Sequence, residues 1–155
     1  MAESRRDQIR MTEAEIEAFI AERKSLQVAV NGHDGFPHLS TLWYGLVDGE
    51  IVFETYTKSQ KIKNLERDPR ITVLLEDGVT YETLRGVMIR GTAELITDRD
   101  AVHPLALAVM TRNQPDIPEE MLSEAAEHMA AKRTAVVVKP QRVVSWDHRK
   151  LSGGY

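Results

Sequence analysis

The chain has no cysteine, no long apolar run and no excess of positive charge, and each absence excludes a class of structure or function. The lack of cysteine excludes disulfides, thiolate metal sites and a cysteine nucleophile. No apolar run is long enough to span a membrane and residues 1–11 lack the apolar stretch of a signal peptide, so we expect a cytoplasmic protein. The net charge of −4 provides no general attraction to nucleic acid. Any anion-binding site must therefore be a local cluster of residues.

Signatures of a doubly wound nucleotide-binding fold are also missing, since the sequence has neither a Gly-x-Gly-x-x-Gly motif nor alternating βαβ units. It has instead short apolar or alternating segments that are separated by turns, which is typical of hairpin-linked strands. Strands are predicted at residues 26–31, 37–46, 50–56, 71–76, 87–96, 134–139 and 142–146. Gly91 lies inside the fifth of these and predicts a bulge or bend there.

Helices are predicted between the strands by their capping residues. Thr12 with Glu15 three residues later forms a capping box, Ser59 precedes a helix that Asp68 and Pro69 close, and Pro118 starts a later helix. A further helix is predicted after residues 97–100. We therefore expect a mainly β protein with helices (α+β), an antiparallel barrel decorated by helices, as one domain over residues 1–155.

The segment TYTKSQK at residues 55–61 concentrates hydroxyls and lysines where a strand is expected to meet a helix. Thr55 and Thr57 share one strand face, and Ser59 as N-cap leaves the backbone N–H groups of Gln60 and Lys61 free at the positive end of the helix dipole. A cation such as Lys61 in the first helical turn is unfavourable for the helix, and a bound anion would resolve that conflict. Two interpretations follow from the residues alone: a phosphate-binding site, or a capped surface helix with solvated lysines.

The histidines and large aromatic residues leave alternatives open. His38 shares a strand face with Ser40 and could hydrogen-bond a cofactor ring or line a wet groove. Glu124 and His128 lie one helical turn apart without a third ligand, so we expect an exposed pair and no metal site. The strand TLWYGLV at residues 41–47 predicts burial of aromatic residues in a core or against a second copy of the chain.

Three motifs stand out along the chain: the SxKxxNLxxDPR run from Ser59 to Arg70, the GTAEL strand that begins at Gly91, and the closing SWDHRKL at residues 145–151. Together they resemble the pyridoxamine 5′-phosphate oxidase-like family of FMN-binding split β-barrels. The resemblance extends from about Thr12 to Leu151 and is greatest to the deazaflavin (coenzyme F420)-dependent reductase branch.

The resemblance implies a split antiparallel β-barrel that forms a homodimer with two cofactor sites at the subunit interface. In this family the strand that matches residues 38–43 runs along the flavin or deazaflavin ring, and the turn that matches residues 59–61 holds the cofactor phosphate. The cofactor-binding residues implied here are His38, Ser40, Thr41, Leu42, Thr55, Ser59, Gln60 and Lys61.

Two departures from the family pattern affect the expected activity. FMN-binding oxidases carry Arg-Lys where this chain has Gln60-Lys61, and His148-Arg149 replace the Arg-x-His substrate signature. We therefore expect an F420-dependent oxidoreductase that transfers a hydride to a small unsaturated or conjugated molecule, with no catalytic residue of its own besides a polarising group such as Ser40 or Thr41. The alternatives are an FMN-dependent pyridoxamine phosphate oxidase-like enzyme and a non-catalytic haem, tetrapyrrole or flavin-binding protein.

Overall fold

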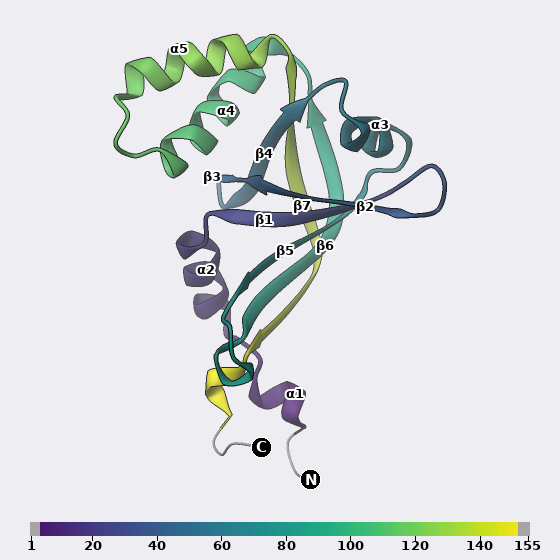
Figure 1. Ribbon diagram of the computed structural model, residues 1–155, viewed down its shortest axis with the longest axis vertical. Helices are drawn as coiled ribbons and strands as arrows, with labels where there is room; N and C mark the ends of the chain where they lie inside the picture. The colour runs from purple at the N-terminus through teal and green to yellow at the C-terminus, as the bar shows by residue number, and fades with distance from the viewer. Residues whose placement is uncertain (1–3, 152–155) are drawn as a thin grey trace.

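The computed structural model describes residues 4–151, and its centre is a curled seven-stranded antiparallel sheet (Figure 1). The order of strands across the sheet is β2-β1-β5-β6-β7-β4-β3. The strands are β1 (Ser25–Asn31), β2 (Pro37–Trp43), β3 (Gly45–Val47), β4 (Glu50–Tyr56), β5 (Arg70–Asp77), β6 (Arg85–Ile96) and β7 (Arg133–Asp147). This architecture confirms the prediction of an α+β fold built on a split antiparallel barrel.

The interior of the curled sheet holds the main hydrophobic core. Strand β1 places Leu26, Val28 and Val30 inward at alternate positions, as expected for a sheet with one buried face. The neighbouring strand β5 repeats this pattern with Ile71 and the following alternate residues. Because the alternation is regular, each residue between these core positions lies on the opposite, outer face of the sheet.

Two strand predictions need correction. The segment predicted as one strand at residues 37–46 is broken at Tyr44, and its halves β2 and β3 lie at opposite edges of the sheet. The buried Tyr44 hydroxyl lies within hydrogen-bonding distance of the Ile20 carbonyl (2.5 Å) and the Arg23 carbonyl (2.8 Å), which holds the break in place. Conversely, residues 134–139 and 142–146 belong to one long strand, β7, that passes through Pro140.

The predicted irregularity at Gly91 is confirmed as a β-bulge. The register of β6 with β7 shifts between Arg90 and Gly91, so Arg90 pairs with Arg142 while Gly91 pairs with Pro140. A Cβ atom at Gly91 would overlap the carbonyl oxygen of Lys139, which explains the need for glycine. The bulge leaves Gln141 as the extra residue of β7 and bends both strands.

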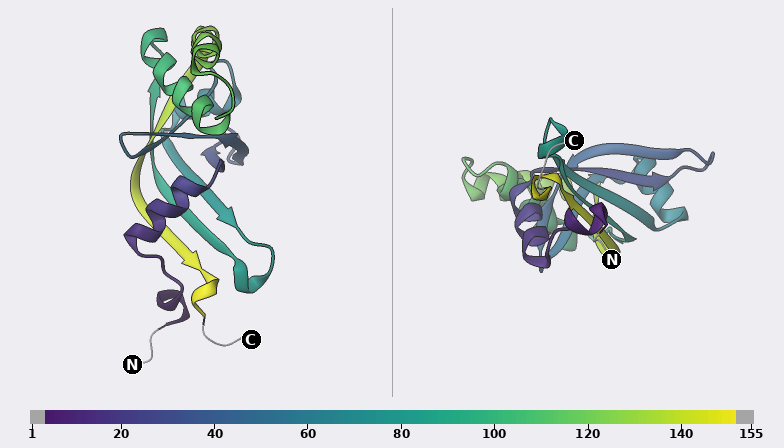
Figure 2. Two further views of the ribbon diagram at one scale, coloured as in Figure 1. Left: turned by 90° about the vertical axis from the view of Figure 1, so that its left-hand side faces the viewer. Right: turned by 90° about the horizontal axis from the view of Figure 1, so that it is seen from below.

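Helices lie at the two ends of the sheet and on two opposite sides of it (Figure 2). They are α1 (Arg5–Gln8), α2 (Glu13–Glu22), α3 (Gln60–Arg67), α4 (Arg99–Asn113) and α5 (Glu119–Ala130), with 3₁₀ turns η1 (Tyr81–Thr83) and η2 (His148–Lys150). The capping box of Thr12 and Glu15 is present, whereas Pro118 is the N-cap of α5 and not its first-turn residue. The helical hairpin of α4 and α5 lies at the opposite end of the molecule from α1 and η2 (Figure 1).

The C-terminal end of α2 is joined to α4 by a single guanidinium group. The Nη2 atom of Arg112, with two N–H donors, lies within hydrogen-bonding distance of the carbonyls of Ile20 (3.0 Å), Ala21 (2.8 Å) and Arg23, which have no further helical turn to bond them. The guanidinium also lies over the ring of Tyr44 at 4.3 Å. No helix among residues 4–151 has the length and apolar character that crossing a membrane requires.

Candidate functional site

A group of hydroxyls lies where β4 ends on the inner face of the curled sheet. Thr55 follows the core residue Phe53 by two positions and is itself buried. Its partner in β7 is the fully buried Thr134, and Thr134 Oγ1 lies 3.0 Å from Thr57 Oγ1. These three threonines therefore lie on one face of the sheet and form a polar surface where the hydrophobic core ends.

Helix α3 begins directly beyond these threonines and presents its N-terminus there. Ser59 is the N-cap, as predicted, and its Oγ accepts a hydrogen bond from the N–H of Ile62 at 3.3 Å. The N–H of Ile62 is thus used by the cap, while the N–H groups of Gln60 and Lys61 have no partner among residues 4–151. Two backbone donors remain for an anion at the positive end of the helix dipole.

Lys61 is the most unusual residue of this site. Only 6% of its surface is exposed, yet its ammonium group has no hydrogen-bond or ion-pair partner among the described residues. Burial lowers the pKa of Lys61, because desolvation disfavours the charged form. Lys63, two residues further on, is exposed and lies 3.7 Å from Glu66. The helix therefore buries one lysine without a counter-ion and leaves the other in solvent.

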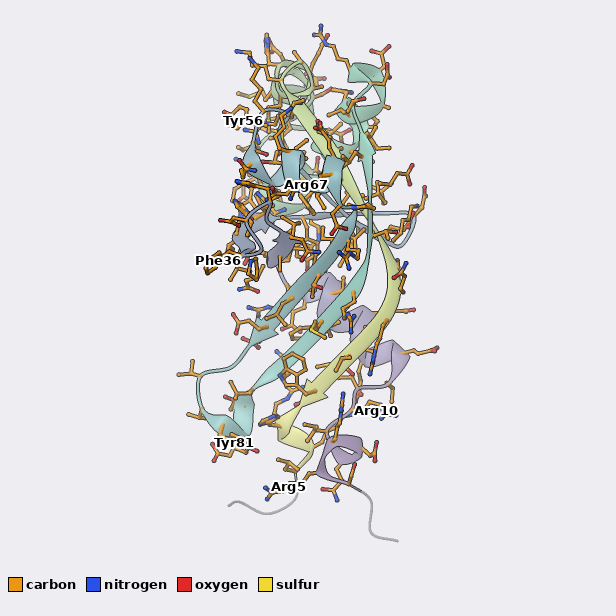
Figure 3. The ribbon with its side chains drawn as sticks, turned by 90° about the vertical axis from the view of Figure 1, so that its right-hand side faces the viewer. Arg5, Arg10, Phe36, Tyr56, Arg67 and Tyr81 are labelled. Atoms are coloured by element: carbon orange, nitrogen blue, oxygen red, sulfur yellow. The ribbon has the colours of Figure 1, made fainter. Side chains whose placement is uncertain are left out.

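Side-chain amides fix the orientation of α3. Gln60 donates from Nε2 to Oδ1 of the buried Asn64 at 2.9 Å. Arg67 donates to the same oxygen at 3.3 Å and to the carbonyl of Asn31 at 2.8 Å, which ties the helix to the end of β1. Arg67 lies between Tyr56 and the loop of Phe36 in Figure 3. The amide of Gln60 is thus already bonded within the helix and does not replace a free guanidinium.

The predicted ring-binding strand, β2, divides its residues between two faces. His38, Ser40 and Leu42 alternate on the partly buried face, and Leu42 packs against the main core. Thr41 lies on the opposite, exposed face with Trp43. His38 Nδ1 and Ser40 Oγ are buried without a hydrogen-bond partner, which is uncommon for buried polar atoms. Both atoms are available to a ligand.

The structure thus brings together the predicted residues in two groups. The first group consists of Thr55, Ser59, Gln60 and Lys61 at the junction of β4 and α3. The second consists of His38, Ser40 and Leu42 on β2, and Thr41 does not share their face. Sequence reasoning missed Thr134 and Asn64. Asn64 could have been found from its spacing of four residues from Gln60, whereas Thr134 depends on the pairing of β4 with β7.

Comparison with known proteins relates nearly the whole chain to one protein family. Residues 12–147 match the family model described as pyridoxamine 5′-phosphate oxidase. The conserved hypothetical protein Rv2991 from Mycobacterium tuberculosis is 42% identical, with 99% of this chain and 98% of that chain covered and a TM-score of 0.87. No match was found among curated proteins.

More distant solved structures share the fold. An F420 reductase is 21% identical over 82% of this chain and 94% of its own, with a TM-score of 0.65. HutZ, a haem storage protein from Vibrio cholerae, is 19% identical over 86% of this chain and 94% of its own, also with a TM-score of 0.65. At these identities the likeness shows a common fold and leaves the ligand undetermined.

Proposed function

Because the chain belongs to the pyridoxamine 5′-phosphate oxidase family, we propose that it is an oxidoreductase that binds the deazaflavin F420 and holds the cofactor phosphate where β4 meets α3. The observation that carries this proposal is Lys61, of which only 6% is exposed and whose ammonium group has no partner among the described residues. A cation on a largely buried side chain without a counter-ion is unfavourable, and a phosphate is the anion that also satisfies hydroxyls and helix N–H groups. Thr55, Ser59 and the first N–H groups of α3 supply these donors.

The choice of F420 over FMN depends on Gln60. The family's FMN-binding oxidases have an arginine at this position, whereas here the Gln60 amide donates to Asn64. The site then has one cationic side chain, Lys61, for the phosphate. With one cationic side chain in place of two, the site attracts the phosphate of FMN less strongly, which favours F420. An F420 reductase also shares the fold.

The residues of β2 would form the wall beside the cofactor ring. Bound F420 supplies the hydride chemistry, and the protein positions the ring and excludes water. Ser40 Oγ and His38 Nδ1 are the unpaired polar atoms of this wall, and Leu42 adds apolar surface. A serine hydroxyl can donate a hydrogen bond that polarises the ring or an unsaturated substrate, so the reaction requires no dedicated base.

A homodimer would complete the site. The outer face of the sheet exposes Leu39 to 67% and Trp43 to 50%, and large apolar side chains exposed together on a sheet mark an interaction surface. Leu39, Thr41 and Trp43 alternate along β2 on this face, directly behind the residues of the proposed ring wall. Because β2 is the edge strand of the sheet, a second copy that covers this face and wraps around that edge would reach the cofactor site on the other side of the strand.

A second candidate function is storage or transport of haem or another tetrapyrrole without turnover. The observation that favours it is the buried His38 Nδ1, because an imidazole nitrogen without a hydrogen-bond partner can serve as an axial ligand to iron. The haem storage protein HutZ has the same fold. In this case Lys61 would pair with a propionate of the porphyrin and not with a phosphate.

Fluorescence titration with F420, and separately with FMN, tests the proposal. Lys61→Ala should weaken F420 binding about 10- to 150-fold, the equivalent of roughly 1.5–3 kcal/mol for a charge-assisted hydrogen bond. The matched control is Lys63→Ala, which removes the same charge from the exposed side of α3 and should have a much smaller effect. The effect of Lys61→Ala should also decrease as the salt concentration rises.

Several outcomes would contradict this function. Equal losses of affinity in the two lysine variants would mean that the start of α3 is a general basic surface and not a specific phosphate site. Tight FMN binding without F420 binding would reverse the choice of cofactor. An intense Soret band on addition of haemin that disappears in His38→Ala would favour the second candidate.

A further inference from the structure

Two arginines lie directly opposite each other on neighbouring strands of the sheet. Arg90 of β6 pairs in register with Arg142 of β7, so both side chains leave the sheet on the same face. This is the outer face, because Ile89 of the preceding position packs in the core. It is therefore opposite to the face of Thr55 and Thr134.

Neither guanidinium is neutralised within the protein. Arg90 and Arg142 are exposed and have no hydrogen-bond or ion-pair partner among residues 4–151. Among their neighbours on the same face, Thr72, Met88 and Val144 are uncharged, whereas Arg70, two residues from Thr72 along β5, is cationic. Like charges directly opposite each other in a sheet are unfavourable. The arrangement is notable in a chain whose net charge is −4.

Two nearby acidic residues already have partners. Glu94, two rows along β6, pairs with Lys139 at 3.3 Å. Asp68 accepts three hydrogen bonds from the side chain of Arg70, the shortest at 2.6 Å. Glu76, the other acidic residue on this face of β5, lies two cross-strand rows from Arg90, beyond Met88, and forms no ion pair with either arginine.

The β-bulge shapes the surface around this pair. A hollow of about 400 Å³ on the side of Arg90 is lined by polar residues, among them Asn31, Thr72 and Gln141, the bulged residue. A second hollow, of about 570 Å³, adjoins Arg142 and contains Arg6 and Arg10. The arginine pair thus stands between two open spaces large enough to admit a small molecule.

We propose that Arg90 and Arg142 form an oxyanion-binding site that takes a carboxylate or phosphate group between the two guanidinium groups. Planar guanidinium groups bind such oxyanions with paired hydrogen bonds, and one anion between them removes their repulsion. The site is separate from the Lys61 site because the two lie on opposite faces of the sheet, and the inference does not depend on the identity of the cofactor.

The oxyanion can come from two sources. It is either a group of a free small molecule or a side-chain carboxylate of a second copy, because Leu39 of the exposed apolar face lies in the same cross-strand row as Arg90. Both sources require the same chemistry at the two arginines.

Calorimetric titration of the full chain with citrate and with pyrophosphate, at constant ionic strength, tests the site. The Lys61→Ala background keeps the other proposed anion site from contributing. We expect saturable binding that Arg90→Gln or Arg142→Gln weakens at least about tenfold. Arg99→Gln is the matched control, since Arg99 is an exposed arginine of α4 whose partner Glu127 lies 3.5 Å away. Without added anion, both variants should be at least as stable as the parent chain, which separates loss of binding from loss of folding.

Sedimentation equilibrium distinguishes the two sources. Loss of citrate binding with an unchanged association state identifies a free ligand. Dissociation of an oligomer in Arg90→Gln and Arg142→Gln, and on citrate addition to the parent chain, identifies a carboxylate of a second copy. The proposal is overturned if Arg99→Gln weakens binding as much as the other two, or if the double variant Arg90→Gln/Arg142→Gln binds and associates like the parent chain.

Discussion

Lys61 shows how a single residue can cost stability while preparing a site. An ammonium group that leaves water without gaining a partner is unfavourable, and burial correspondingly lowers the pKa of Lys61. If Lys61 holds the cofactor phosphate as proposed, it would gain from the arriving anion, because burial of the side chain has already removed part of its hydration. Part of the binding free energy of the cofactor would thus be prepared during folding.

The free energy of unfolding should show this cost through its pH dependence. Below the lowered pKa, Lys61 is charged in both the folded and the unfolded chain, and the folded chain carries the full cost of burial. Between the lowered pKa and the ordinary value of about 10.4, the unfolded chain binds more protons, so stability rises with pH. Lys61→Met should therefore be more stable than the parent chain at neutral pH, and its advantage should shrink as the pH rises through this window.

Urea unfolding at a series of pH values without cofactor measures the effect. Lys63→Met is the control, since it removes the same charge from an exposed position of the same helix, where no burial cost is expected. A constant difference between Lys61→Met and the parent chain at every pH would mean that Lys61 keeps its hydration in the folded state.

At the scale of elements, Arg112 supplies hydrogen-bond donors to the last carbonyls of α2. The last carbonyls of α2 need donors, and the chain provides them from α4 through one guanidinium, about 90 residues later in the sequence. Asn113 adds a bond to the carbonyl of Tyr44 at 3.0 Å. This contact sets the position of the α4–α5 hairpin relative to the sheet.

Arg112→Met should lower the free energy of unfolding by about 2–3 kcal/mol, because several carbonyls lose their charged donor while the side chain keeps much of its length. Chemical denaturation measures the loss. Arg112→Lys should recover only part of it, since an ammonium group cannot stack over the ring of Tyr44 as the planar guanidinium does. Arg99→Gln, which removes an exposed ion pair of α4, should cost less than about 1 kcal/mol. Equal losses at positions 99 and 112 would contradict the role given to Arg112.

The elements that the sequence predicts well are those with local signals. Thr12 and Ser59 act through neighbours a few residues away, and each was found in its predicted role. Gly91 was found at a bulge as predicted from a glycine within a strand, although the contact that requires glycine there is with Lys139 of β7. The division of residues 37–46 into β2 and β3 could not be predicted, because the Tyr44 hydroxyl that fixes the break bonds to the end of α2. The candidate site shows the same limit: Ser59 and Lys61 were found locally, while Thr134 reaches the site only through the pairing of β4 with β7.

At the scale of the whole molecule, the exposed apolar face predicts association. Trp43→Glu places a charge on this face and should shift the chain from dimer to monomer, because a carboxylate buried against a second copy would lack a partner. Sedimentation velocity would show a species of twice 17.5 kDa for the parent chain and of 17.5 kDa for the variant. Val79→Glu is the control, because Val79 is 97% exposed and follows β5 outside this face. A parent chain that sediments as a monomer at micromolar concentration would remove the basis for an interface site.

The position of β7 between β6 and β4 has a consequence for synthesis on the ribosome. Strands β3 and β4 join the rest of the sheet only through β7, which spans Arg133–Asp147. A growing chain that has already released β4 and α3 therefore cannot complete the sheet until the last strand emerges. During that interval the unpaired edge of β4 and the apolar inner face are open to other nascent chains, so chaperone protection matters most until β7 has emerged.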